Sequence, residues 1–232
     1  MIYVMSDIHG MYDKYIKMLE TIDLSPKDTL YILGDIVDRG PASMRILKDM
    51  MGRSNIKPIF GNHELMMIEC IEWIAKEITD ELLNDIDENK LIKLSDWLEN
   101  GGCQTIREFK TLTRNEQRAI IDFLMDFTAY EEVSVNGKVY LFIHAGLSAF
   151  DKDKSLDEYD ADDFVWESPD FEMPYFDDTD QYVIVGHTPT PLLSGKTQIF
   201  HKNNFIAIDC GACFENGMLA CLCLDTMEEF YV

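Results

Sequence analysis

The first third of the chain repeats one pattern three times: a short apolar run, a polar turn containing glycine, and a stretch with apolar residues at helical spacing. The apolar runs are IYVM, TLYIL and KPIF, and the turns that follow them are SDIHG, GDIVDRGP and GNHE. Strands that alternate with helices form βαβ units, whose strands lie parallel in one sheet. Loops beyond the carboxyl ends of such strands form binding crevices, so the three polar turns are expected at one edge of the sheet.

The rest of the chain predicts a helical segment followed by further strands. Residues 65–128 have mostly helical patterning, and Thr113 and Glu116 have the spacing of a capping box. We expect this segment to form a helical insertion or cap within a single domain spanning residues 1–232. Asn136-Gly137 between two β-rich runs predicts a hairpin. The later runs QYVIV, TQIF, FIAID and MLACLCLD predict the strands of a second, mixed sheet, so the fold class is α/β.

The charge of the chain excludes some classes of partner. Asp and Glu total 43 against 20 Lys and Arg, a formal net charge of −23. Phosphate backbones and anionic membranes are bound by clustered basic residues, so we expect no nucleic-acid or membrane partner. No apolar run reaches the ~18 residues of a membrane span. The first strand-like run leaves no room for a signal peptide, so we expect a cytoplasmic protein.

The cysteines near the carboxyl end allow two interpretations. Cys210 and Cys213, followed by Cys221 and Cys223, could form a zinc site. Alternatively, Cys221 and Cys223 alternate with leucines in a buried strand, where a free cysteine packs as a small apolar side chain. The second pair lacks the usual C-x-x-C spacing, and the packing interpretation is therefore favoured.

Histidines gather where the predicted strands end. Four of the five histidines, namely His9, His63, His144 and His187, follow such strands together with aspartate and asparagine. Oxygen and imidazole ligands without thiolate suit Mn²⁺, Fe or Zn²⁺. Six ligands are too many for one open mononuclear site and fit two metals that share a bridging carboxylate. The sequence therefore predicts a dinuclear metal site at this edge.

Five short motifs follow one another between residue 6 and about residue 188, in the order SDIHG, GDIVDRG, GNHE, HAG and GHT. This series resembles the phosphoprotein phosphatase family of the calcineurin-like metallophosphoesterases, and the chain is similar in size to the compact bacterial serine/threonine protein phosphatases. The resemblance implies a β-sandwich of two mixed sheets flanked by helices. It also implies hydrolysis of phosphoric esters by two divalent metal ions, with Mn²⁺ the first expectation and Fe or Zn²⁺ as alternatives.

The resemblance also implies a role for each matching residue. Asp35 would bridge the two metals, His63 would be the general acid oriented by Asp38, and Arg39 would hold phosphate oxygens. A hydroxide bridging the metals would attack phosphorus in line with His63. The remaining metal ligands would be Asp7 and His9 for the first ion and Asn62, His144 and His187 for the second.

One departure from the family pattern bears on the substrate. Family members usually carry a second phosphate-binding arginine between the HAG and GHT motifs, but here Glu167 follows Trp166, and 13 acidic residues lie between Asp151 and Asp180. We therefore expect a poor fit to highly anionic substrates and favour a serine/threonine protein phosphatase acting on a phosphorylated protein, peptide or small phosphoester. Glu64 and the VDRG motif favour the same interpretation. The alternatives are a symmetrical dinucleoside polyphosphate hydrolase and a catalytically silent metal-binding scaffold. The sequence does not indicate an oligomeric state.

Overall fold

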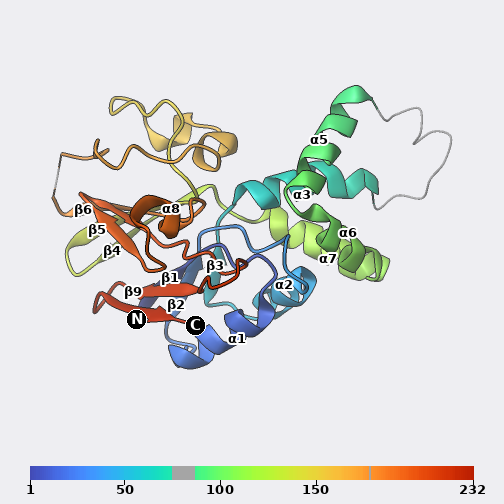
Figure 1. Ribbon diagram of the computed structural model, residues 1–232, viewed down its shortest axis with the longest axis horizontal. Helices are drawn as coiled ribbons and strands as arrows, with labels where there is room; N and C mark the ends of the chain where they lie inside the picture. Colours follow the sequence, from blue (N-terminus) through green and yellow to red (C-terminus); the bar gives the residue numbers. More distant parts are fainter. Residues whose placement is uncertain (75–86, 178) are drawn as a thin grey trace.

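Two five-stranded sheets form the centre of the computed structural model, which describes residues 1–74, 87–177 and 179–232 (Figure 1). In the first sheet the strand order is β10-β9-β1-β2-β3, and β1, β2 and β3 run parallel to one another. The bounds are β1 (Ile2–Met5), β2 (Thr29–Ile32), β3 (Ile56–Pro58), β9 (Ala220–Cys223) and β10 (Glu228–Tyr231). The three predicted βαβ strands are therefore present and adjacent.

The second sheet has the order β4-β5-β6-β8-β7. Strands β5, β6 and β8 are parallel, while the two edge strands pair antiparallel with their neighbours, so this sheet is mixed. The predicted Asn136-Gly137 turn joins β4 to β5, and both residues have positive φ. The bounds are β4 (Tyr130–Val135), β5 (Lys138–Ile143), β6 (Gln181–Val185), β7 (Phe200–Lys202) and β8 (Phe205–Ala207).

The MLACLCLD run forms a strand, as predicted, but the expectation that it joins the second sheet is wrong. It forms β9, which pairs antiparallel with β1 and with β10 in the first sheet. All four β9 residues are buried, because the strand lies inside that sheet with neighbours on both sides. A buried strand is apolar on both faces, so its sequence carries no period that would assign it to one sheet.

Alternating side chains divide the interior into layers. Along β1, Val4 packs into a cluster between the two sheets, whereas Tyr3 and Met5 pack on the helical side of the first sheet. Along β6, Ile184 joins the cluster between the sheets, and Val183 and Val185 face the long segment after β5. Side chains of a strand alternate between its two faces, so this division is the one expected of a sandwich with both outer faces covered.

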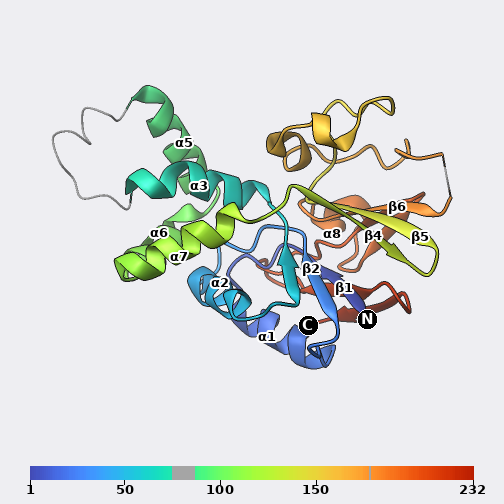
Figure 2. The ribbon, with the colours of Figure 1, turned by 180° about the vertical axis from the view of Figure 1, so that it is seen from behind.

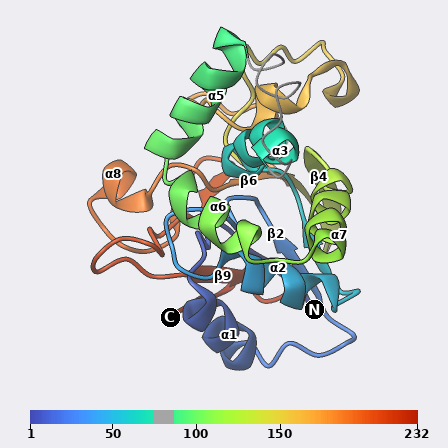
Figure 3. The same cartoon turned by 90° about the vertical axis from the view of Figure 1, so that its right-hand side faces the viewer.

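The helices other than α8 cover the outer face of the first sheet and extend to one side of it, while α8 packs against the second sheet (Figures 2 and 3). Helices α3, α5, α6 and α7 form a group beside the sheets, while α1 and α2 lie beneath the first sheet. The bounds are α1 (Tyr12–Thr21), α2 (Ser43–Met51), α3 (Asn62–Ile74), α5 (Glu88–Glu99), α6 (Gly102–Lys110), α7 (Arg114–Met125) and α8 (Thr190–Ser194).

The predicted helical segment at residues 65–128 overlaps this group of helices. Residues 75–86 lie outside the described part of the chain, and α3 already begins at Asn62. The predicted capping box is present at the start of α7, where Thr113 and Glu116 exchange hydrogen bonds. Among the described helices, none combines the length and the hydropathy needed to span a bilayer.

Candidate active site

The predicted site residues converge from the ends of five strands. Asp7 and His9 follow β1, and the turn with Asp35, Asp38 and Arg39 follows β2. The other site residues stand after β3, β5 and β6, at Asn62 and His63, at His144 and at His187. The parallel order of these strands within each sheet places their carboxyl ends at a common edge.

Backbone strain is concentrated in these turns. Twelve non-glycine residues among the described ones have positive φ, and the site supplies six of them. A positive φ costs a non-glycine residue roughly 1–3 kcal/mol, and it persists where the surrounding structure over-determines it. The six residues are Asp7, His9, Asp35, Asp38, Arg39 and His187. This clustering marks the turns as a functional site, because strain of this kind gathers where side chains must be aimed.

One group of ligand atoms has four members that face one another. His144 Nε2 lies 3.0 Å from Asn62 Oδ1 and 3.3 Å from Asp35 Oδ1, and His187 Nδ1 lies 3.1 Å from Asn62 Oδ1 and 3.2 Å from His144 Nε2. The Nδ1–H group of His144 donates to the Leu33 carbonyl at 2.6 Å, which leaves Nε2 without a proton. His144 Nε2, Asn62 Oδ1 and Asp35 Oδ1 each present a lone pair here, and such lone pairs repel one another unless a proton or a cation lies among them, so these atoms could hold a metal ion.

A second group shares Asp35 with the first. His9 Nε2 lies 3.5 Å and His63 Nε2 lies 3.8 Å from Asp35 Oδ2, and the Nδ1–H group of His9 donates to the Val37 carbonyl at 2.9 Å. Both groups have the compactness of metal sites, and Asp35 offers one oxygen to each. Each group could hold a metal ion, and the predicted role of Asp35 as the bridge between two metals stays a prediction.

Asp7 lies beside these groups without belonging to either of the two found among the described residues. Its carboxylate accepts hydrogen bonds from the Ser6 hydroxyl and, at 3.0 Å, from the backbone N–H of His187. It is close enough that its charge raises the pKa of Asp35. The structure thus brings Asp7 to the site, and its predicted role as a ligand of the first metal stays a prediction.

Burial sets the electrostatics of the cluster. It raises the pKa of Asp7 and of Asp35 well above the usual carboxyl range, and the proximity of Asp209 and of Asp7, respectively, adds to each shift. It also lowers the pKa of His9 and of His144 well below the usual range. The imidazoles therefore stay neutral, and the carboxylates are costly to ionise because they are buried. A divalent cation bound by these side chains would supply a compensating positive charge.

His63 and Asp38 form a buried dyad. His63 Nδ1 donates to Asp38 Oδ2 at 2.7 Å, which directs Nε2 towards Asp35. Burial lowers the pKa of His63 to about 3, and the Arg39 guanidinium contributes to this shift. Burial raises the pKa of Asp38 to about 7, while hydrogen bonds from Thr105 and Trp97 oppose the rise. The predicted pair is therefore together, in the geometry required of an acid and the carboxylate that orients it.

Arg39 lies across the mouth of the site. Its Nη1 atom donates to His9 Nε2 at 2.7 Å and its Nη2 atom donates to His63 Nε2 at 3.0 Å. Its guanidinium carbon lies 5.9 Å from the centre of the half-exposed Phe214 ring. Nη1 also lies 4.0 Å from Cys213 Sγ. The predicted phosphate-binding residue thus contacts both imidazoles that face Asp35 Oδ2.

Sequence reasoning gave no catalytic role to Glu64 and missed Asp209, and both are buried here. Glu64 accepts hydrogen bonds from the backbone N–H groups of Asp35, Ile36, Val37 and Gly61 at 2.8–3.2 Å. It therefore shapes the turn that carries Asp35. Asp209 accepts from the Gly211 N–H at 2.7 Å, and burial raises its pKa to about 6. The sequence signal for Glu64 was its place in the GNHE motif, and for Asp209 it was only a carboxylate at the end of a strand-like run.

Two further features lie outside the metal groups. The described cysteines belong to neither group, and Cys221 and Cys223 are buried in β9, as the packing interpretation predicts.

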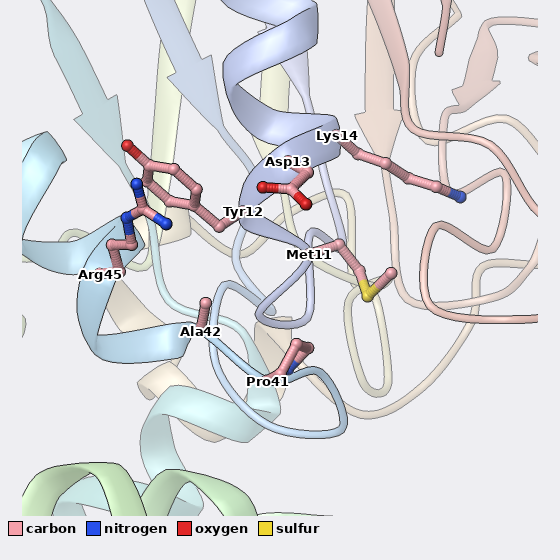
Figure 4. Close-up of a pocket in the computed structure, with 7 residues that line it drawn as sticks. All are labelled: Met11, Tyr12, Asp13, Lys14, Pro41, Ala42 and Arg45. Carbon is pink, nitrogen blue, oxygen red and sulfur yellow. The ribbon is translucent and has the colours of Figure 1, made fainter.

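A pocket lies beside the turns after β1 and β2, at the starts of α1 and α2, where the Arg45 guanidinium stacks over the Tyr12 ring at 3.8 Å (Figure 4). The residues that line it are Met11, Tyr12, Asp13, Lys14, Pro41, Ala42 and Arg45, and none of them is a predicted site residue.

The amino-acid sequence is similar to those of named bacterial enzymes. A protein called bis(5'-nucleosyl)-tetraphosphatase, symmetrical, from Delftia acidovorans is 28% identical over 144 residues, which cover 60% of this chain and 50% of that protein. A protein of the same name from an Enterobacter species is 26% identical over 232 residues, covering 98% of this chain and 71% of that protein. The chain thus spans between about half and about seven tenths of the length of these relatives.

Solved structures share the fold. One, provisionally described as a diadenosine tetraphosphatase, superposes with a TM-score of 0.63 at 16% identity over 100% of this chain and 92% of the other. A serine/threonine phosphatase from Saccharomyces cerevisiae superposes with a TM-score of 0.59 at 15% identity over 95% of this chain and 72% of the other. The family model for calcineurin-like phosphoesterases matches residues 1–212. The chain belongs to the calcineurin-like phosphoesterase family.

Proposed function

We propose that the chain is a dinuclear metal-dependent hydrolase and that its substrates are symmetrical dinucleoside tetraphosphates. The observation that carries the dinuclear part is that Asp35 turns one oxygen towards His144 and the other towards His9. The substrate class is supported by the relatives named for that activity, one of which aligns with 98% of the chain. This substrate was the alternative interpretation of the sequence, and the relatives favour it over a protein phosphatase.

The donor set indicates which metals the site would hold. Imidazole, carboxylate and amide donors without thiolate suit Mn²⁺, Fe or Zn²⁺, and we propose Mn²⁺ as the first ion to test. The predicted ligands are Asp7, His9 and Asp35 for one ion and Asp35, Asn62, His144 and His187 for the other. Two such cations lower the pKa of a bound water and stabilise the attacking and leaving oxygens of an in-line displacement.

The side chains supply the remaining steps. In symmetrical cleavage, the oxygen of water bonds to one of the two central phosphorus atoms and the bond from that phosphorus to the central bridging oxygen breaks, which yields two nucleoside diphosphates. His63 Nε2, which faces the shared carboxylate, would give a proton to the departing oxygen. Arg39 would turn its two N–H groups from the imidazoles to phosphate oxygens.

Engagement of Arg39 by phosphate would also favour the acid form of His63. At present Arg39 donates to His63 Nε2 and lowers the pKa of that imidazole, after the larger effect of burial. A phosphate anion would remove the donor from Nε2 and bring negative charge beside it. Both changes stabilise the imidazolium, so binding of the substrate and readiness of the acid would be linked.

A phosphorylated protein or peptide is the second candidate substrate. The segment from Asp151 to Asp180 carries 13 acidic residues, and Glu167 stands where a second arginine is usual, which disfavours a polyanion. In the opposite direction, the half-exposed Phe214 ring beside Arg39 offers a face on which a nucleobase can stack. The two candidate substrates therefore differ in whether they stack on the Phe214 ring, and substitution of Phe214 removes that contact.

The deciding experiment compares kcat/KM for diadenosine tetraphosphate with that for a phosphothreonine peptide in Mn²⁺. We expect preference for the dinucleotide with ADP as the nucleotide product, whereas preference for the peptide would support the second candidate. Phe214→Ala should raise KM for the dinucleotide about 5-fold or more, because a stacked base contributes ~1–3 kcal/mol. It should leave 4-nitrophenyl phosphate nearly unaffected. Met125→Ala, an exposed apolar position on α7, is the matched control.

The acid role of His63 has its own test. His63→Ala should keep both metal ions and lose about 10²- to 10⁴-fold in kcat on substrates with poor leaving groups. The loss should be much smaller for 4-nitrophenyl phosphate, whose leaving group needs little protonation. Equal losses on both kinds of substrate would show that His63 does not act as the acid.

A further inference from the structure

Two helices distant in sequence from the metal-binding turns touch Asp38 directly. Trp97 lies in the last turn of α5, and Thr105 lies in the first turn of α6. Gly101 precedes α6 and Gly102 is its first residue. We call residues 97–105 the α5–α6 corner. These residues lie 59 to 67 positions after Asp38 in the chain, yet their side chains meet its carboxylate.

Trp97 and Thr105 bond the two oxygens of Asp38 separately. Trp97 Nε1 donates to Oδ2 at 2.8 Å, and the Thr105 hydroxyl donates to Oδ1 at 2.5 Å. The same hydroxyl accepts from the Asp38 N–H at 3.0 Å, so its own proton is committed to the carboxylate. All three residues are completely buried. Together with the Nδ1–H group of His63, these donors leave the carboxylate one orientation.

The two glycines make this approach possible. The Gly101 carbonyl accepts from the Arg39 N–H at 3.3 Å, and Gly101 has a φ of +105°, which side-chain-bearing residues rarely adopt. A Cβ atom on Gly101 would lie 2.9 Å from Arg39 Cγ, and a Cβ atom on Gly102 would lie 2.6 Å from Trp97 Nε1. The corner is thus fitted against both Asp38 and Arg39.

The carboxylate needs these donors because it is buried beside an imidazole. Burial raises the pKa of Asp38 to about 7, and the hydrogen bonds from Thr105 and Trp97 act against that rise. A carboxylate that loses them would take up a proton more readily and rotate more freely. It would then hold the Nδ1–H group of His63 less well, and the direction of Nε2 would be less defined.

We propose that Trp97 and Thr105 are positioning residues, which hold the Asp38 carboxylate so that His63 presents Nε2 to the leaving group. The helical group beside the sheets therefore takes part in the reaction through the acid. This inference rests on the proposed function in one respect, the role of His63 as the acid. It concerns no contact between the corner and the metals or the substrate.

Three variants and one control separate positioning from packing. Trp97→Phe keeps the ring and removes the indole N–H, and Thr105→Val keeps the shape and removes the hydroxyl. Thr105→Ser restores the hydroxyl, and the Asp38 N–H keeps Ser43 as an acceptor in each Thr105 variant, at 3.1 Å. Trp73→Phe is the matched control, because Trp73 packs against the same apolar cluster without contacting Asp38.

The kinetic readout is the dependence on the leaving group. With Mn²⁺ and a series from 4-nitrophenyl phosphate to phenyl phosphate, Trp97→Phe and Thr105→Val should each lower kcat for phenyl phosphate about 10- to 100-fold. KM should change little, and the loss for 4-nitrophenyl phosphate should be several times smaller. Thr105→Ser and Trp73→Phe should resemble the parent. In a His63→Ala background, Trp97→Phe should cause no further loss, whereas a packing defect would persist there.

A second readout does not require turnover. The Nδ1–H proton of His63, identified in the NMR spectrum by its loss in His63→Ala, should be protected from exchange in the parent, in Trp73→Phe and in Thr105→Ser. It should exchange faster or disappear in Trp97→Phe and Thr105→Val. An unchanged proton in both variants, or equal kinetic losses along the whole series, would overturn the inference. A parent that cleaves neither diadenosine tetraphosphate nor any member of the series, while the NMR result holds, would instead contradict the proposed function alone.

Discussion

Glu64 provides a quantitative test of how the Asp35 turn is held. Its Oε2 atom accepts from the Asp35 and Gly61 N–H groups, and its Oε1 atom accepts from those of Ile36 and Val37. In Glu64→Gln one oxygen becomes an NH₂ group, which donates and cannot accept. Whichever way the amide is turned, two buried backbone N–H groups lose their acceptor.

The expected cost follows from that count. A buried donor without a partner costs about 1–3 kcal/mol, so two such donors cost ~4 kcal/mol. Removal of the buried negative charge stabilises the folded protein and offsets part of this loss of stability. Burial raises the pKa of Glu64 to about 6, and the ionised form at neutral pH therefore carries a cost of ~2 kcal/mol. We expect the free energy of unfolding of the metal-free protein to fall by ~2 kcal/mol.

Urea denaturation of parent and variant measures this difference. Glu64→Gln should also weaken Mn²⁺ binding, because the turn that carries Asp35 loses its support. Glu69→Gln, an exposed residue on α3, is the control and should change neither quantity. A Glu64→Gln variant at least as stable as the parent, with unaltered metal affinity, would refute the reasoning.

Three further outcomes follow from the described contacts. Asp35→Asn should raise the melting temperature of the metal-free protein, because burial and the nearby Asp7 carboxylate raise the pKa of Asp35 and make its ionised form costly. The variant should also reduce the stabilisation that Mn²⁺ gives the parent, and a parent that Mn²⁺ does not stabilise would argue against the site. Gly102→Ala should displace the Trp97 indole and lower kcat for phenyl phosphate more than for 4-nitrophenyl phosphate, and a uniform loss would count against this. A thiol reagent should modify the exposed Cys103 first, and inorganic phosphate should slow modification of Cys213 beside Arg39; equal rates with and without phosphate would contradict the placement of that anion.

The parts of the site that could be predicted lie in short turns after strands. Asp7 and His9, or Asp38 and Arg39, are neighbours in sequence, and the βαβ pattern brings their turns to one edge. Trp97 and Thr105 could not be found in this way, because their approach to Asp38 depends on how α5 and α6 pack. Their residue types are those of an ordinary helix interior, and only the Gly101-Gly102 pair at the start of α6 marks the corner.

The sheet assignment of β9 failed for a related reason. Its residues are buried on both faces, and the antiparallel pairing with β1 joins positions more than 200 residues apart. Local pattern identifies such a segment as a strand but contains no information about its neighbour. Glu64 is a different case, because its motif was visible in the sequence but its contacts were not. In the structure its carboxylate accepts hydrogen bonds from backbone N–H groups of the Asp35 turn.

The central claim is that six side chains hold two divalent cations joined by Asp35. Equilibrium dialysis against Mn²⁺, followed by elemental analysis, counts the ions bound per chain. The parent and His63→Ala should each bind two. Asp35→Asn should bind fewer than two at the same free Mn²⁺ concentration, because it loses a ligand of both positions. One ion or none in the parent, or two retained in Asp35→Asn, would contradict the account.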